Sequence, residues 1–156
     1  MIDKITKTFT SLNWLGNMSP CKIIYNGEEW DSDEKLFQAM RFNDECIRQK
    51  IRNEKGIFKS NLLVSNLSIY TVVEPMSSLD IENLRTAMQL KFDQNKILQL
   101  KLLSTDNINL VLFRKKHYDP EDLFWGMTII DEQWIGMNIV GKILMEIRAK
   151  IKYFNN

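Results

Sequence analysis

Residues 30–42 read WDSDEKLFQAMRF, and this stretch decides the predicted fold. Asp31 is a residue type that caps helix N-termini, and Glu34 three residues later makes the pattern close to a capping box. We therefore predict a helix after Asp31, with Glu34 in its first turn and the polar side chains of Gln38 and Arg41 further along the same face. The apolar face of this helix consists of Leu36, Phe37 and Met40.

A hairpin is predicted directly before this helix. Residues 22–25 and 28–30 flank Asn26-Gly27, a dipeptide that accepts the positive φ angles of a two-residue turn. Residues 108–113 alternate between apolar and polar types and predict another strand. We expect the hairpin and this strand to form one small antiparallel sheet.

The rest of the chain is predicted to be mostly helical. Helices are expected before Gly56, from Ser78 or Asp80 onward, after Asn95, and from Val140 to Ile151. Periodicity does not decide the structure of residues 57–76, and residues 114–137 are expected to form a long ordered loop. The prediction is a single helix-rich α+β domain spanning residues 1–156.

The composition is ordinary for a soluble globular protein and argues against several other classes. The 156 residues are 44% hydrophobic and carry a net charge of +1, so composition does not predict attraction to nucleic acid or membranes. Cys21, Cys46 and His117 cannot build a structural zinc site, and we expect both cysteines to be buried, reduced thiols. Without a secretory signal or a spanning apolar run, the sequence predicts a cytoplasmic protein with no membrane contact.

Four further motifs accompany the helix around Glu34. Residues 15–21 read LGNMSPC, residues 87–95 read AMQLKFDQN, residues 122–126 read DLFWG, and residues 136–141 read GMNIVG. In this order and spacing, the motifs resemble those of the NADAR family, the YbiA-like N-glycosidases. The resemblance extends from about Phe9 to Arg148.

The resemblance implies cleavage of a bond between a ribose carbon and a nitrogen. Family substrates include phosphorylated riboflavin-pathway ribosylamines and ADP-ribosylated guanine, so the expected partner is a ribosyl or ADP-ribosyl molecule, free or on nucleic acid. Glu34 and Asp122 match the acids of two family motifs and are the expected catalytic residues. The residues expected to bind the substrate are Asn17, Gln38, Arg41, Lys91, Trp125, Gly126 and Asn138. No cofactor and no metal are expected.

These residues suit the chemistry. Breaking an N-glycosidic bond builds positive charge on the sugar, which a carboxylate such as Glu34 stabilises. A second acid, Asp122, positions water or a ribose hydroxyl. Trp125 supplies a flat wall, and the cations Arg41 and Lys91 hold a phosphate. The amides Asn17 and Asn138 orient the ribose.

Three positions depart from the family pattern. Many members have lysine where this chain has Arg41, and a guanidinium stays protonated and cannot act as a covalent amine. Met76 falls where a tryptophan is frequent, and Leu112 falls where an acid is frequent. These departures support an alternative function, a module that binds ADP-ribose or a nucleotide without cleaving it.

Structural roles remain open for the same residues. Glu34 can be only a capping residue, and Asp122 can cap the turn that leads into Phe124 and Trp125. Trp125 can be a core residue, and Gly126 can serve backbone geometry. Asn138 can be the N-cap of the last helix. A purely structural interaction domain is the third possible function.

Overall fold

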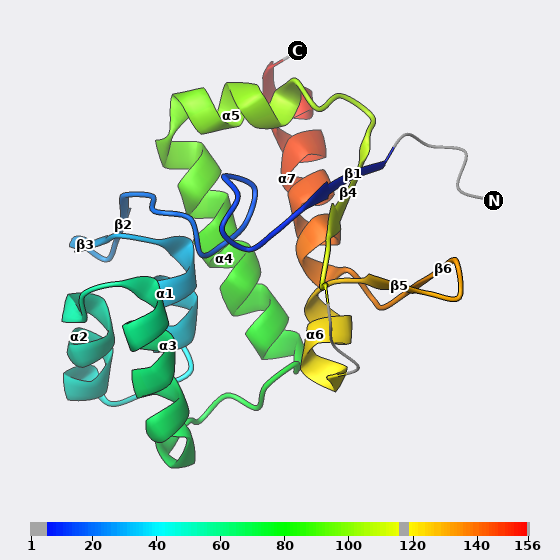
Figure 1. Ribbon diagram of the computed structural model, residues 1–156. Coiled ribbons are helices and arrows are strands. Elements are labelled where there is room, and N and C mark those ends of the chain that lie inside the picture. Colours follow the sequence, from blue (N-terminus) through cyan, green and yellow to red (C-terminus); the bar gives the residue numbers. More distant parts are fainter. Residues whose placement is uncertain (1–5, 116–118, 156) are drawn as a thin grey trace. The chain divides into compact units, whose positions relative to one another are not determined.

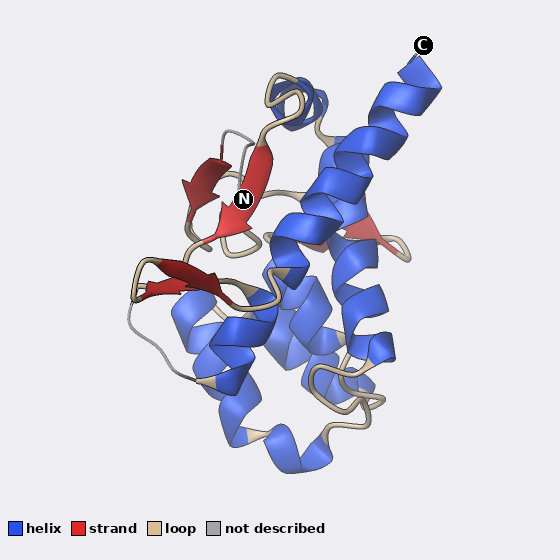
Figure 2. Cartoon of the chain, turned by 90° about the vertical axis from the view of Figure 1, so that its right-hand side faces the viewer, coloured by secondary structure: helices blue, strands red, loops and turns tan. Residues whose placement is uncertain are grey.

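The computed structural model describes residues 6–115 and 119–155, and the chain divides into two compact units. One unit comprises residues 17–94, and the other comprises residues 1–16 together with 95–156. The described residues form a helix-rich α+β fold with short strands in pairs (Figure 2), which confirms the predicted fold class. That residues 1–156 form a single domain stays a prediction.

The unit of residues 17–94 contains a hairpin and four α-helices. Its elements are β2 (Ile23–Tyr25), β3 (Glu28–Trp30), α1 (Asp33–Ala39), α2 (Glu45–Asn53), α3 (Ile57–Asn66), the 3₁₀-helix η1 (Ser68–Tyr70) and α4 (Ser78–Gln94). Helices α1, α2 and α3 pack side by side, and α1 also packs against α4 (Figure 1). The core of this unit includes the buried residues Leu36, Phe37, Leu84, Met88 and Phe92.

Local chemistry explains the start of this unit. The predicted hairpin is confirmed, because Asn26 and Gly27 have φ angles of 50° and 78° and β2 pairs antiparallel with β3. The predicted N-cap is wrong by one residue. The Oγ of Ser32, not Asp31, accepts from the Lys35 N–H at 3.3 Å, and the Asp31 carboxylate instead accepts from Lys35 Nζ at 2.7 Å. Glu34 still lies in the first turn of α1.

The second unit combines helices with two strand pairs. Its elements are β1 (Thr6–Phe9), α5 (Lys96–Leu103), β4 (Asn109–Leu112), α6 (Pro120–Trp125), β5 (Thr128–Ile130), β6 (Gln133–Ile135) and α7 (Ile139–Asn155). Strand β4 pairs in parallel with β1, and β5 and β6 form an antiparallel hairpin. Helix α7 packs on β4 and α5 and buries Ile143, Leu144 and Ile147.

Several predictions about these elements were wrong. The predicted strand within residues 108–113 is β4, and it pairs with β1 and not with the β2–β3 hairpin. The prediction missed this pairing because β1 lies near the start of the chain, far from β4 in the sequence. The expected loop 114–137 contains α6, β5 and β6, whose short lengths leave almost no periodicity to detect. Cys21 is buried as expected, but Cys46 is exposed. His117 lies outside the described residues.

Some absences can be stated for the described ranges. Within residues 6–115 and 119–155, no helix is both long enough and apolar enough to cross a bilayer. In the same ranges, no three His, Cys, Asp or Glu side chains gather as a metal site would require.

Candidate active site

The Glu34 carboxylate is held by two amides. Asn17 Nδ2 donates to Oε2, and Gln38 Nε2 donates to Oε1 at 2.8 Å from one turn further along α1. The backbone N–H of Glu34 also donates to the Asn17 carbonyl at 3.0 Å. Glu34 is only 6% exposed. These bonds restrict the carboxylate to one orientation at the N-terminal end of a helix, as a preorganised electrostatic group requires.

The buried ion pair between Arg41 and Asp80 orients the side chain of Gln38. Arg41 Nη1 donates to Gln38 Oε1 at 3.0 Å, so the amide of Gln38 turns its NH₂ group toward Glu34. The guanidinium also donates from Nε and Nη2 to the two carboxylate oxygens of Asp80 at 2.8 and 2.7 Å. It lies 4.6 Å from the centre of the Phe37 ring. Arg41 thus positions Gln38. Its guanidinium group, which was expected to bind a phosphate, binds the carboxylate of Asp80 in this structure.

Asp80 is itself fully buried at the start of α4. Its side chain is 0% exposed, and its Oδ2 also accepts from the Met76 N–H at 2.8 Å. Met76 has a positive φ of 63°, which turns its N–H toward this carboxylate. The structure therefore links Asp80, Arg41, Gln38, Glu34 and Asn17 in one hydrogen-bonded series, and all five belong to the unit of residues 17–94.

Lys91 lies in a separate buried cluster. Its side chain is 0% exposed, and its Nζ donates to Ser19 Oγ at 3.0 Å and lies 3.5 Å from Asp33 Oδ1. The predicted contact between Lys91 and a phosphate gains no support from this position, because no part of the side chain reaches the surface. Lys91 instead neutralises a carboxylate one residue away from Glu34.

The other predicted site residues belong to the second unit. Asp122 on α6 forms an ion pair with Arg114, with 3.0 Å between Oδ1 and Nε, and remains 25% exposed. Trp125 is buried and meets the Phe124 ring edge-on at 4.8 Å between ring centres. At Gly126, a Cβ atom would lie 2.5 Å from the Leu112 carbonyl, so close backbone approach explains this glycine.

Asn138 has a structural task that its residue type explains. Its Nδ2 donates to the Leu110 carbonyl at 2.9 Å, and its Oδ1 accepts from the Leu112 N–H at 3.1 Å. The amide thus acts as an extra partner for β4, and its left-handed φ of 53° suits asparagine. The predicted contact between Asn138 and ribose stays a prediction, because both described bonds of the amide go to backbone.

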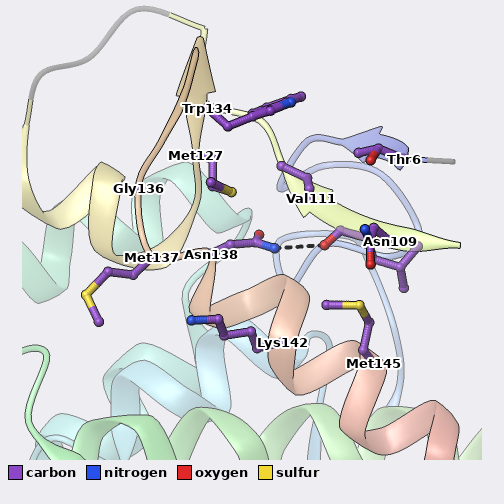
Figure 3. A pocket seen from close by; sticks show the side chains of 11 residues that line it. Thr6, Asn109, Val111, Met127, Trp134, Gly136, Met137, Asn138, Lys142 and Met145 are labelled. Atoms are coloured by element: carbon purple, nitrogen blue, oxygen red, sulfur yellow. Dashed lines mark hydrogen bonds between the residues drawn. The ribbon is translucent and has the colours of Figure 1, made fainter. Parts of the chain in front are cut away.

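A cavity of about 300 Å³ lies within this unit (Figure 3). Its walls come from β4, the β5–β6 hairpin and α7, and include Trp134, Met127, Met145 and Lys142. Figure 3 shows Asn138 at this cavity with its amide turned to the backbone of β4. Among the predicted site residues, Asn138 is the one at its lining, so the cavity does not bring the predicted site together.

Comparison with known proteins decides the family. A family model described as the NADAR domain matches residues 5–152. The chain belongs to the NADAR domain family. This confirms the resemblance that the motifs carried.

The curated relatives bear related names. The "riboflavin biosynthesis protein VVA0006" of Vibrio vulnificus is 27% identical over 139 residues, which are 89% of this chain but only 35% of that protein. The "N-glycosidase YbiA" of Shigella sonnei is 28% identical over 135 residues, covering 86% of this chain and 79% of the relative. The "N-glycosidase R617" of Acanthamoeba polyphaga mimivirus is 37% identical over 70 residues, covering 40% of this chain and 38% of the relative.

A solved structure shares the fold. The NMR structure of the Escherichia coli protein YbiA superposes with a TM-score of 0.81 at 24% identity, covering 99% of this chain and 89% of that one. The NADAR fold of this chain is therefore shown, and N-glycosidase names recur among its relatives.

Two acids of this NADAR domain escaped sequence reasoning. The sequence predicts Asp80 only as a possible helix start, and nothing in WDSDEK distinguishes Asp33 from its neighbours. Both are completely buried, and a buried acid is informative because it needs a partner. The sequence feature that could have pointed to these acids is the presence of acidic residues in the first turns of α1 and α4. Favourable interaction with the helix N-terminus explains that feature equally well.

Replacing Asn138 by alanine tests its structural role. The variant leaves the Leu110 carbonyl and the Leu112 N–H without their side-chain partner, and alanine adopts the left-handed φ poorly. We expect the free energy of unfolding to fall by about 2–4 kcal/mol in urea denaturation. Asn107→Ala in the exposed turn before β4 is the control, expected within about 0.5 kcal/mol of the unmutated protein. Equal stability of the two variants would contradict this role.

Proposed function

We propose that this NADAR protein is an N-glycosidase that hydrolyses the bond between a ribose carbon and a nitrogen, with Glu34 as the key carboxylate. The substrate is an ADP-ribosylated guanine base or a phosphorylated riboflavin-pathway ribosylamine. The names of the relatives support the reaction class. The observation that carries the proposal is the Glu34 carboxylate, fixed between the amides of Asn17 and Gln38.

This arrangement suits a reaction in which the ribose becomes positively charged. As the carbon–nitrogen bond lengthens, the ribose becomes an oxocarbenium-like cation and the nitrogen leaves with the bonding electrons. A fixed carboxylate with little exposed surface stabilises the cation without having to reorganise. Water then adds to the ribose carbon and loses a proton, for which Glu34 is our proposed acceptor, and this proton passes on to the leaving nitrogen, which restores the carboxylate.

Arg41 limits how the reaction proceeds. A guanidinium held by Asp80 and Gln38 does not attack the ribose carbon as a neutral amine. We therefore propose direct attack by water, without a covalent link between residue 41 and the sugar. The participation of Asp122 and Trp125 stays a prediction from their motif, with Asp122 positioning the water or a ribose hydroxyl.

Product analysis tests the function. The protein is incubated separately with an ADP-ribosylated guanine oligonucleotide, a phosphorylated riboflavin-pathway ribosylamine and NAD⁺, and the products are identified by mass spectrometry. We expect release of the free base or amine together with the ribose fragment from one of the first two compounds. Intact substrates in all three incubations, with a folded protein, would overturn the proposal.

The pairing of the Arg41 guanidinium with Asp80 also favours a second candidate function. A module that binds ADP-ribose without cleaving it needs no amine at position 41. Such a module would be stabilised against heating by ADP-ribose and would leave all three compounds intact. Thermal unfolding with and without ADP-ribose, measured beside the product analysis, separates the two functions.

A further inference from the structure

Asp33, the residue before Glu34 in α1, carries a second buried carboxyl group. Asp33 is 0% exposed, and within the described residues neither of its carboxylate oxygens accepts a hydrogen bond of regular geometry. Lys91 from α4 lies 3.5 Å from Oδ1, and this cation is also 0% exposed. A buried carboxylate without regular hydrogen bonds is costly, so its presence calls for an explanation.

The ionisable groups around Asp33 come from three segments. Lys91 faces it from α4, and Glu34 adjoins it on α1. Ser19 and Cys21 belong to the segment before β2: Ser19 accepts a hydrogen bond from Lys91, and the Cys21 thiol interacts electrostatically with both Lys91 and Asp33. Burial raises the pKa of Asp33 to about 7, Lys91 opposes this rise, and the neighbouring Glu34 adds to it.

We propose that the Asp33–Lys91 pair sets the charge next to Glu34 and thereby determines the pH above which the reaction is fast. This inference rests on the proposed N-glycosidase function. When Asp33 holds its proton, the pair carries the positive charge of Lys91, which opposes a cationic ribose. When Asp33 loses that proton to solvent, the pair is neutral and the negative charge of Glu34 acts on the ribose undiminished. Asp33 is a positioning residue here, because it acts through Glu34.

The pH profile of kcat/KM provides the first test, using the substrate identified by product analysis. For the unmutated protein we expect kcat/KM to rise about 3- to 10-fold as the pH increases through the neutral range, the effect of one nearby charge at intermediate dielectric. Asp33→Asn removes the carboxylate that neutralises Lys91, so this variant should stay at the low value. The exposed Asp93→Asn on α4 is the control and should retain the rise.

A second variant protects the test against misfolding. Asp33→Asn leaves Lys91 buried without its counter-ion and is therefore at risk of unfolding. Asp33→Asn/Lys91→Met removes both charges and replaces the lysine by an apolar side chain of similar length. We expect this double variant to show the high kcat/KM across the range, without the neutral rise. A persistent neutral rise in either variant would overturn the inference.

Unfolding as a function of pH tests the same groups without any substrate. Because the folded pKa of Asp33 lies above the ordinary value of 3.8, its contribution to stability is full below pH 3.8 and disappears as the pH rises through about 7. The urea midpoint of the unmutated protein should therefore fall relative to that of Asp33→Asn between these pH values.

The outcomes separate the inference from the proposed function. Parallel urea midpoints for the unmutated protein and Asp33→Asn would overturn the inference, whatever the activity. If the midpoint difference changes with pH but kcat/KM still rises through the neutral range in both variants, Asp33 titrates without affecting the rate, and the inference is overturned as well. If the difference in urea midpoint between the unmutated protein and Asp33→Asn changes with pH but no compound is hydrolysed, the proposed function is overturned, and with it the effect on rate.

Discussion

Glu34→Gln will lower kcat by about 10²–10³-fold on the substrate identified by product analysis, the cost of losing one well-placed electrostatic group. The reason is that glutamine keeps the size of the side chain but loses the negative charge that stabilises the cationic ribose. The variant should remain folded. Its new NH₂ group meets the donor of either Asn17 or Gln38, which costs about 1–2 kcal/mol.

A matched control exists on the neighbouring helix. Glu45 lies in the first turn of α2, as Glu34 lies in the first turn of α1, but its side chain is exposed. Glu45→Gln is therefore the same chemical change at a similar helix position, and we expect it to leave kcat unchanged. Steady-state kinetics of both variants, together with circular dichroism, provide the comparison. A folded Glu34→Gln protein with nearly full kcat would remove Glu34 from the mechanism.

Asp80→Asn should produce the largest loss of stability, about 3–5 kcal/mol, because it leaves the buried guanidinium of Arg41 without its counter-ion. The measurement is urea denaturation at neutral pH. Activity should fall as well, because Arg41 then no longer holds Gln38 in the orientation that faces Glu34.

The control for Asp80→Asn lies on the same helix. Glu82 pairs with Arg85 at the surface, where its side chain is 63% exposed. Glu82→Gln should cost at most about 1 kcal/mol, since solvent screens such pairs. Replacing both partners of the buried pair, in Arg41→Met/Asp80→Leu, should recover much of the stability lost in Asp80→Asn. A loss for Asp80→Asn no larger than that for Glu82→Gln would show that the buried pair is not a stabilising element.

The family and the surroundings of Glu34 within α1 could be predicted because they depend on neighbours along the chain. The turn at Asn26-Gly27 and the helix after Ser32 follow from local backbone preferences. Gln38 lies four residues after Glu34, so helical geometry alone brings the two side chains together. Arg41 follows Gln38 by three residues, a separation that also brings two side chains together.

The short elements between residues 114 and 137 could not be predicted in this way. Helix α6 has six residues, and β5 and β6 have three each. Such lengths contain less than two turns of helix or a single alternation, so packing decides what they become. The partner of β4 was equally hidden, because β1 lies about a hundred residues earlier in the chain.

The sequence alone determined the NADAR family, the helix-rich fold and the placement of Glu34 and Gln38 on one face of α1, with Arg41 in the turn directly after this helix. Only the tertiary structure decided what those residues bond. It assigned the fork of Arg41 to Asp80, placed Lys91 against Asp33, and turned the amide of Asn138 to β4. The physical reason is that buried charges and amides must find partners, and those partners come from distant segments that no local pattern connects.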